Sequence, residues 1–301
     1  MATKTFTQIA VLGLYTETPL HCGAESATGY VDLPVQRERH TAYPVIPGST
    51  LKGVLRDEMK DLGPAKLKSY FGESDEGSRK TSPGEVSFGD GIIVAFPVRC
   101  TEGPFVWITC PFALERALRA LAAPHKVDNP SAGKAWAKAD GDILLEELLL
   151  VREKRDDLFA ESGPLAELGR LIPASPSFAY THSIFLDRLL VLNDGEFQEL
   201  VETGTEVLTR IKLNAVGTTT NLKDGEYPEI KGEDRKGNMF VEEVVPRETL
   251  FLTVLRAPKD SAFESDDIPK VVRLGGDETI GRGVTHVTAV RPASAPATKK
   301  R

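Results

Sequence analysis

Alternating apolar and polar positions predict a β-strand close to the N-terminus. In residues 6–18, apolar side chains such as Ile9, Val11 and Leu14 recur at roughly alternate positions until Pro19. We expect a half-buried strand at the centre of a sheet. Similar strand patterns occupy residues 84–95, 105–110, 183–186, 189–192, 249–255 and 285–290, the first interrupted by a Gly-Asp-Gly bend.

Apolar positions at helical spacing predict helices between these strands. Leu51, Leu55 and Met59 recur every four residues, so a helix is expected from an N-cap at Ser49 or Thr50 to about residue 62. A short helix is expected at 113–122 and an amphipathic one over 197–213.

Three segments do not follow this order. Residues 124–180 are irregular apart from a helical piece at 143–151 and are interpreted as an insertion, residues 217–238 are almost wholly polar, and the tail 294–301 is expected to be disordered. The remaining order of elements predicts an α+β sheet of ferredoxin-like type, in a single domain over residues 1–293.

Composition is that of a soluble globular protein. Of the 301 residues, 41% are hydrophobic and 27% charged, which excludes a wholly disordered chain. No signal peptide or apolar run of membrane-spanning length is evident, so a cytoplasmic protein without a membrane partner is expected. Cys22, Cys100 and Cys110 form no CxxC pair, and neither a disulfide framework nor a structural zinc site is indicated.

Net charge directs attention to one short stretch. The formal charge of -7 is unlike that of a generic nucleic-acid binder. Between residues 34 and 56, however, four basic residues stand against Glu38 alone, which gives a local charge of +3. These four residues are Arg37, Arg39, Lys52 and Arg56.

Residues 21–47 predict a long Gly- and Pro-containing loop, whose segment 21–39 contains candidate catalytic groups. Asp32, flanked by apolar residues, can bind a hydrated Mg²⁺ or orient an attacking hydroxyl. The alternative is a turn Asp that caps its own backbone. His21 is suited to acid–base chemistry near neutral pH, although a lone His at a strand end is more often structural.

The start of the helix at residue 48 is a candidate phosphate site. Its backbone amides can bind an anion, and Lys52 lies one turn inside. Arg37, Arg39 and Arg56 can extend that surface, whereas a plain capped surface helix is the alternative.

Two further segments are candidates. Residues 274–283 (LGGDETIGRG) contain four glycines and Arg282, which suits close approach to a polyanion but is equally typical of a tight hairpin. After the polar stretch 217–238, Glu242 or Glu243 can complete a carboxylate site, or be a solvated acidic pair. No P-loop, Rossmann fingerprint, GxSxG elbow or HExxH helix is present.

Together these segments resemble the backbone subunit of the type III-B CRISPR (Cmr) effector complex, within the RAMP superfamily. The resemblance covers most of the chain. It is carried by residues 13–21 (GLYTETPLH), 31–41 (VDLPVQRERHT), 46–53 (IPGSTLKG), 107–111 (WITCP) and the glycine-rich loop.

The resemblance implies an RRM-like, ferredoxin-type core with a projecting β-hairpin thumb at about 214–240. It also implies partners: a guide RNA, a complementary target RNA, other copies of the chain in a filament and other Cmr subunits. Guide contacts are expected from Ser49, Lys52, Arg37, Arg39, Arg56 and Arg282.

The same resemblance implies metal-dependent cleavage of the target RNA at regular intervals. Asp32 matches the family's cleavage residue and would bind a divalent ion, Mg²⁺ or Mn²⁺, with His21 and Glu242 in support. A non-catalytic RNA-binding scaffold and a stand-alone guide-processing endoribonuclease remain as alternatives, while no motif favours a small-molecule enzyme.

Overall fold

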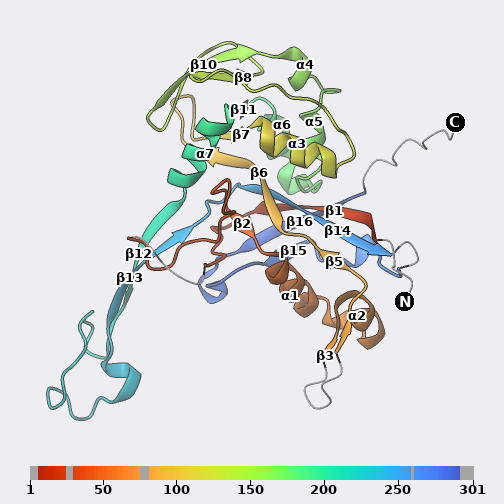
Figure 1. Ribbon diagram of the computed structural model, residues 1–301. Coiled ribbons are helices and arrows are strands. Elements are labelled where there is room, and N and C mark those ends of the chain that lie inside the picture. Colours follow the sequence, from red (N-terminus) through yellow and green to blue (C-terminus); the bar gives the residue numbers. More distant parts are fainter. Residues whose placement is uncertain (1–5, 25–29, 75–80, 259–260, 292–301) are drawn as a thin grey trace.

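The computed structural model describes residues 6–24, 30–74, 81–258 and 261–291 (Figure 1). The predicted tail 294–301 lies outside the described residues. The strands are β1 Phe6–Thr16, β2 Val45–Ile46, β3 Gly72–Ser74, β4 Thr81–Pro83, β5 Ser87–Phe88, β6 Gly91–Val98, β7 Val106–Thr109, β8 Lys134–Ala137, β9 Gly141–Leu145, β10 Leu148–Lys154, β11 Leu189–Val191, β12 Glu206–Lys212, β13 Asn238–Val244, β14 Leu250–Pro258, β15 Val271–Arg273 and β16 Val284–Val290. The α-helices are α1 Gly48–Glu58, α2 Pro64–Phe71, α3 Pro111–Ala120, α4 Asp156–Phe159, α5 Ala166–Gly169, α6 Ala179–Phe185 and α7 Asp194–Thr203.

A large mixed sheet organises the body of the protein. Within the described residues it has twelve strands, in the order β15-β16-β1-β14-β6-β7-β11-β8-β10-β9, with β2 beside β6 and β5 beside β14. Most neighbours are antiparallel, whereas β7 and β11, and β8 and β10, run parallel. This confirms the predicted α+β class.

Strand β1 lies inside the sheet, between β16 and β14, and is buried on both faces. Leu12 and Leu14 face one hydrophobic cluster, while Val11 and Tyr15 face the other. The half-buried strand predicted from the sequence is therefore wrong in its exposure, because helices cover both sides of the sheet. Leu51 and Leu55 place α1 on one face.

The opposite face is covered by α3, α5 and α6 (Figure 1). Leu114, Leu168 and Phe185 from these helices join Val11 in its cluster. Because both faces of the sheet are closely packed, its strands are held rigidly, and so are the points at which the connecting segments leave the sheet.

Helix α1 starts differently from the prediction. Its N-cap is Pro47, not Ser49 or Thr50, and no side chain of the cap bonds to the helix. Instead the Gly48 amide donates to Asp90 Oδ1 at 2.7 Å. Asp90, which belongs to the Gly-Asp-Gly bend between β5 and β6, thus occupies an amide that the sequence had suggested for a phosphate.

The segment 124–180 does contain short helices, but the helical piece predicted at 143–151 is wrong. Residues 143–151 form the β9–β10 hairpin, in which Leu145 pairs with Leu148 and Glu146 takes a left-handed conformation with φ 49°. Alternate burial of Ile143 and Leu145 is the strand pattern, and the tight turn separates two runs that together had suggested one helix. These strands extend the main sheet, followed by the short helices α4, α5 and α6.

Two other predictions change. Residues 183–186, predicted as a strand, are the last residues of α6 and its C-cap, Leu186. The amphipathic stretch 197–213 divides at Gly204 into α7 and β12. Strand β12 pairs with β13 in a separate antiparallel hairpin, which projects from the body and carries the polar segment 213–237 at its tip (Figure 1).

The glycine-rich loop 274–283 packs onto the backbone that follows β1. The Gly276 amide donates to the His21 carbonyl at 2.8 Å, and the Gly283 amide to the Pro19 carbonyl at 2.9 Å. Gly275 has φ 81°, and a Cβ there would stand 2.1 Å from the His21 carbonyl oxygen. Only glycine permits this contact.

Gly275→Ala should therefore be much more destabilising than Gly281→Ala. Gly281 has φ 83°, but no described atom lies within 4 Å of the point that a Cβ would occupy, so its substitution carries only the left-handed backbone cost of about 1 kcal/mol. The collision at Gly275 should add roughly 1 to 3 kcal/mol. Urea unfolding of both variants measures the difference, and equal losses would contradict the packing.

Candidate functional site

Asp32 is exposed and is held against strand β13. Its amide donates to the Val241 carbonyl at 3.1 Å, and its Oδ2 accepts the Val241 amide at 2.8 Å. Leu33 continues this pairing toward Glu243. The side chain thus does not cap its own turn. A carboxylate fixed by a strand 209 residues away presents its charge to solvent at the base of the hairpin.

Glu242, the next residue of β13, points inward and is fully buried. Its Oε2 lies 3.1 Å from Arg210 Nη1 and 3.3 Å from Arg282 Nη2, and Asp277 pairs with the same two arginines. Burial and hydrogen bonding to Asp277 raise the pKa of Glu242, whereas the Glu242 hydrogen bond lowers the pKa of Asp277. Of the two carboxyl groups, Glu242 is therefore the more easily protonated.

His21 is buried beside this cluster. Its Nδ1 lies 2.7 Å from the Glu243 carbonyl oxygen, which can only accept, so Nδ1 carries the proton. Nδ1 is also 4.0 Å from Glu242 Oε1, a buried oxygen without a hydrogen-bond partner among the described residues. The imidazole is thereby held through Nδ1, with Nε2 close to Gly23.

Glu243 points to the opposite side of β13 and holds the segment that follows Asp32. Its Oε1 accepts from Arg37 Nη2 at 2.6 Å and from Thr205 Oγ1 at 2.7 Å, and its Oε2 accepts from the Val35 amide at 2.9 Å. Burial opposes ionisation, but these hydrogen bonds lower the pKa of Glu243 overall. The carboxylate is therefore charged and structural.

Two of the arginines expected to contact RNA are engaged within the protein. Besides Glu243, the Arg37 guanidinium donates to the carbonyls of Ala42, Val201 and Glu202. Arg282 pairs with Glu242, and only 13% of its side chain is exposed. Their RNA contacts stay predictions. In the structure both arginines bind carboxylates of β13, the strand that also holds Asp32.

The other predicted RNA-binding residues are accessible on a separate element. Ser49, Lys52 and Arg56 share one face of α1, at spacings of three and four residues. Gly53 lies between them on this face, with no described atom within 4 Å of where a Cβ would be. Arg39 is exposed as well. This face can receive the backbone of a polyanion closely.

The donor groups around Asp32 suit a magnesium-type ion only if the substrate supplies ligands. Within the part of the chain that the structure describes, no three His, Cys, Asp or Glu side chains are arranged to hold a metal. Mg²⁺ commonly uses one or two carboxylates together with waters and substrate phosphates, and Asp32 offers one such carboxylate. Glu242, being buried and paired with arginines, offers none.

Sequence reasoning did not find Arg210 and Asp277, and left Glu243 as an alternative to Glu242. Arg210 lay in a stretch interpreted as helix, where its partner across β13 could not be seen. Asp277 was part of the glycine-rich loop but drew no attention beside Arg282. The available signal was an Asp directly after two glycines, and the structure gives this Asp a φ of 62°, which Asp adopts more readily than most residues.

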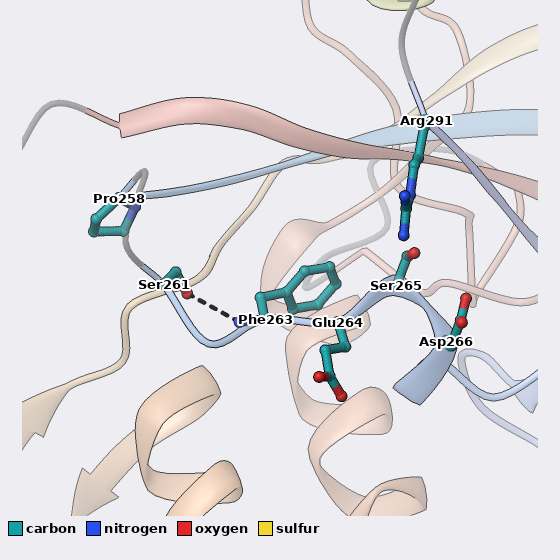
Figure 2. Close-up of a pocket in the computed structure, with 7 residues that line it drawn as sticks. All are labelled: Pro258, Ser261, Phe263, Glu264, Ser265, Asp266 and Arg291. Carbon is teal, nitrogen blue, oxygen red and sulfur yellow. Dashed lines mark hydrogen bonds between the residues drawn. The ribbon is translucent and has the colours of Figure 1, made fainter.

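A cavity of about 540 Å³ lies away from this cluster, between the end of β14 and residue 291 (Figure 2). It is lined by Pro258, Ser261, Phe263, Glu264, Ser265, Asp266 and Arg291. None of these is a predicted site residue.

Among the described helices, none is long and apolar enough to cross a membrane.

The fold and the site define an α+β protein with a basic helix face and a fixed, exposed carboxylate at the base of a projecting hairpin. The model of the RAMP superfamily matches residues 14–285, and the chain belongs to this superfamily.

Two comparisons find similarity along nearly the whole chain. The CRISPR system Cmr endoribonuclease Cmr4 of Pyrococcus furiosus is 32% identical over 300 residues, which cover 92% of this chain and 94% of that protein. The crystal structure of oligomeric Cmr4 from the same organism matches with a TM-score of 0.67 and 26% identity, covering 96% of this chain and 100% of that one. The family resemblance inferred from the sequence is confirmed.

A third match shows the fold alone. A chain in the cryo-EM structure of the type III-B Cmr-beta complex bound to cognate target RNA has a TM-score of 0.67 at 20% identity, covering 94% of this chain and 98% of that one.

The buried Glu243 carboxylate should make stability depend on acid pH. Because its folded pKa lies below the ordinary value of 4.5, its contribution is complete above pH 4.5 and is lost as pH falls through the folded pKa. Glu243→Gln should lower the free energy of unfolding by about 2 kcal/mol at pH 7, and this difference should shrink below pH 4.5.

Thermal unfolding from pH 7 to pH 3.5 measures this difference. Glu229→Gln, at an exposed position in the hairpin's tip, is the control and should change stability by less than about 0.5 kcal/mol. A Glu243→Gln deficit that stayed constant at all pH values would contradict the assigned ionisation.

Proposed function

We propose that the chain is a guide-RNA-binding filament subunit of a type III-B CRISPR effector complex, and that it cleaves complementary target RNA at regular intervals. The observation that carries this proposal is the exposed Asp32 carboxylate, held by β13 at the base of the projecting hairpin. The name of the Pyrococcus relative, a Cmr endoribonuclease, supports the same activity.

The proposed reaction is attack of a target ribose 2′-hydroxyl on its adjacent phosphodiester. The 2′-hydroxyl gives up its proton as its oxygen forms a bond to phosphorus. The bond from phosphorus to the 5′-oxygen breaks, that oxygen takes up a proton, and the products are a 2′,3′-cyclic phosphate and a 5′-hydroxyl. Asp32 would orient the 2′-hydroxyl or hold a divalent ion against the phosphate. A bound Mg²⁺ or Mn²⁺ would supply charge stabilisation for the phosphorane-like transition state.

The other two predicted catalytic residues would act on Asp32's surroundings. Glu242 is fully buried and His21 is 9% exposed, so neither offers a surface to RNA in this conformation. His21 bonds to the Glu243 carbonyl and Glu242 joins the arginines. We propose that both support the strand on which Asp32 rests.

The β12–β13 hairpin would be the thumb that sets the cutting interval. One face of it carries the exposed apolar side chains Val207, Ile211 and Met239, and Ile211 pairs directly with Met239. Such a face can stack on splayed bases. One hairpin and one Asp32 in each copy of a filament would give one cut per copy, on a core of ferredoxin-like type.

Guide binding is proposed for the exposed face of α1. Ser49, Lys52 and Arg56 would contact phosphates through side chains, with Arg39 nearby in sequence. The chain's overall charge of -7 then restricts RNA to this face, instead of attracting it everywhere.

Asp32→Asn should abolish target cleavage by the reconstituted complex with Mg²⁺, by at least about 10²-fold, while guide and target affinities stay within twofold. The Val241 amide can still bond to the Asn side chain, so the loop should keep its position. Single-turnover cleavage of a labelled target measures the rate, and filter binding measures the affinities.

Unchanged regular cutting by this variant would make the chain a scaffold. Cleavage of repeat-containing precursor RNA by the isolated chain would instead favour a guide-processing enzyme. EDTA added to the wild-type complex tests the metal: cleavage should stop and return with Mg²⁺ or Mn²⁺.

The double variant Lys52→Gln, Arg56→Gln should bind guide RNA with a weaker salt dependence. Each lost phosphate contact to a single strand lowers the slope of log affinity against log salt by about 0.7, so a decrease of roughly 1.4 is expected. Arg99→Gln, whose side chain is 78% exposed beside Glu146, is the control and should leave the slope unchanged. Equal slopes for all three proteins would exclude α1 as the contact surface.

A further inference from the structure

We infer that Asp277 and Arg210 are positioning residues for Asp32: they anchor the base of the hairpin to the glycine-rich loop and so keep the cleavage carboxylate in place. The inference rests on the proposed cleavage role of Asp32. It concerns two residues that do not touch Asp32 and that no sequence motif pointed to.

The position of Asp32 depends on β13. Its amide and one carboxylate oxygen both bond to Val241, and the Glu243 amide donates to the Leu33 carbonyl at 2.9 Å. A shift of β13 along or across the body therefore carries Asp32 with it. A displacement of about 1 Å at a reacting group can lower a rate by roughly a hundredfold.

Arg210 connects the two strands of the hairpin to the body. It lies on β12 opposite Phe240 and reaches two residue pairs along the ladder, to Glu242 Oε2. The same Nη1 pairs with Asp277. Asp277 is the only partner of the Arg210 side chain outside the hairpin among the interactions of the described residues.

Asp277 is a rigid anchor because its loop is fixed on both sides. Gly276 bonds to the His21 carbonyl and Gly283 to the Pro19 carbonyl, and Gly275 leaves no room for a side chain there. Asp277 itself has φ 62°, a conformation that Asp and Asn tolerate better than most residues. The hairpin, by contrast, extends away from the body (Figure 1).

Charge balance explains why both carboxylates are needed. Arg210 and Arg282 face Glu242 and Asp277, two positive groups against two acidic ones, in surroundings where Glu242 has no access to water. Without Asp277, both arginines depend on Glu242 alone, and the link between β12 and the loop is broken.

The test compares Asp277→Asn, Arg210→Gln and Arg210→Lys in the reconstituted complex. Asn keeps the size and backbone tolerance of Asp277 but not its charge. Asp277→Asn and Arg210→Gln should each lower the single-turnover cleavage rate about tenfold or more, with guide and target affinities within twofold of wild type. Arg210→Lys should recover part of the rate, because an ammonium retains one charged contact.

Glu278→Gln is the matched control. Glu278 belongs to the same loop but pairs with Arg273 at the surface, where both side chains are 57% exposed, and its substitution should leave the rate unchanged. Hydrogen exchange of residues 238–244 gives a readout independent of activity. Exchange should accelerate in Asp277→Asn and Arg210→Gln, and not in Glu278→Gln.

Wild-type rates and exchange in both Asp277→Asn and Arg210→Gln would overturn the inference. So would a loss confined to target affinity, or an equal loss in Glu278→Gln. Failure of the proposed function is a different result: Asp32→Asn would then cut normally, whereas the exchange of residues 238–244 would still report whether Asp277 and Arg210 hold the hairpin.

Discussion

The burial of the Glu242 carboxylate is the constraint on which the candidate site depends. A carboxylate without solvent access must be protonated, paired or both, and here two arginines and Asp277 surround it. These partners come from the hairpin and from the glycine-rich loop, so satisfying one buried group fixes two distant segments against each other. Asp32 takes its place from that junction, since it pairs with the residue before Glu242.

Successive residues of β13 serve opposite sides because side chains alternate along a strand. Glu242 binds inward to the glycine-rich loop, and Glu243 binds Arg37 and the Val35 amide on the other side. The segment from Asp32 to Arg37 is thus bonded to a single strand through backbone and side chains. An exposed catalytic carboxylate on such a segment has little freedom to reorganise, which suits a reaction governed by geometry.

The sequence was most informative where patterns were long. The strands β1, β14 and β16 and the helix α1 were predicted because their apolar positions recur over seven or more residues. Predictions from short apolar runs were wrong. Residues 143–151 satisfy helical and strand spacing alike, and what decides between them is a turn at Glu146 with a positive φ that no propensity predicts. Residues 206–212 form a strand because β13, farther along the chain, pairs with them.

The site was predicted in part for a similar reason. Asp32 and the residues on α1 became candidates through local motifs and the family resemblance, and the structure leaves Asp32, Ser49 and Arg56 exposed and Lys52 half-buried. Arg37 and Arg282 were counted as surface charge, yet their partners are carboxylates far away in sequence, which a charge count cannot reveal.

Asp90 is also a distant carboxylate, and it changes what the start of α1 can bind. Its carboxylate accepts the Gly48 amide at the positive end of the helix, so the proposed RNA strand would meet the helix along its flank, where Ser49 and Arg56 are about 10 Å apart. The spacing of these side chains along the helix would then select which phosphates of the guide can be bound at the same time.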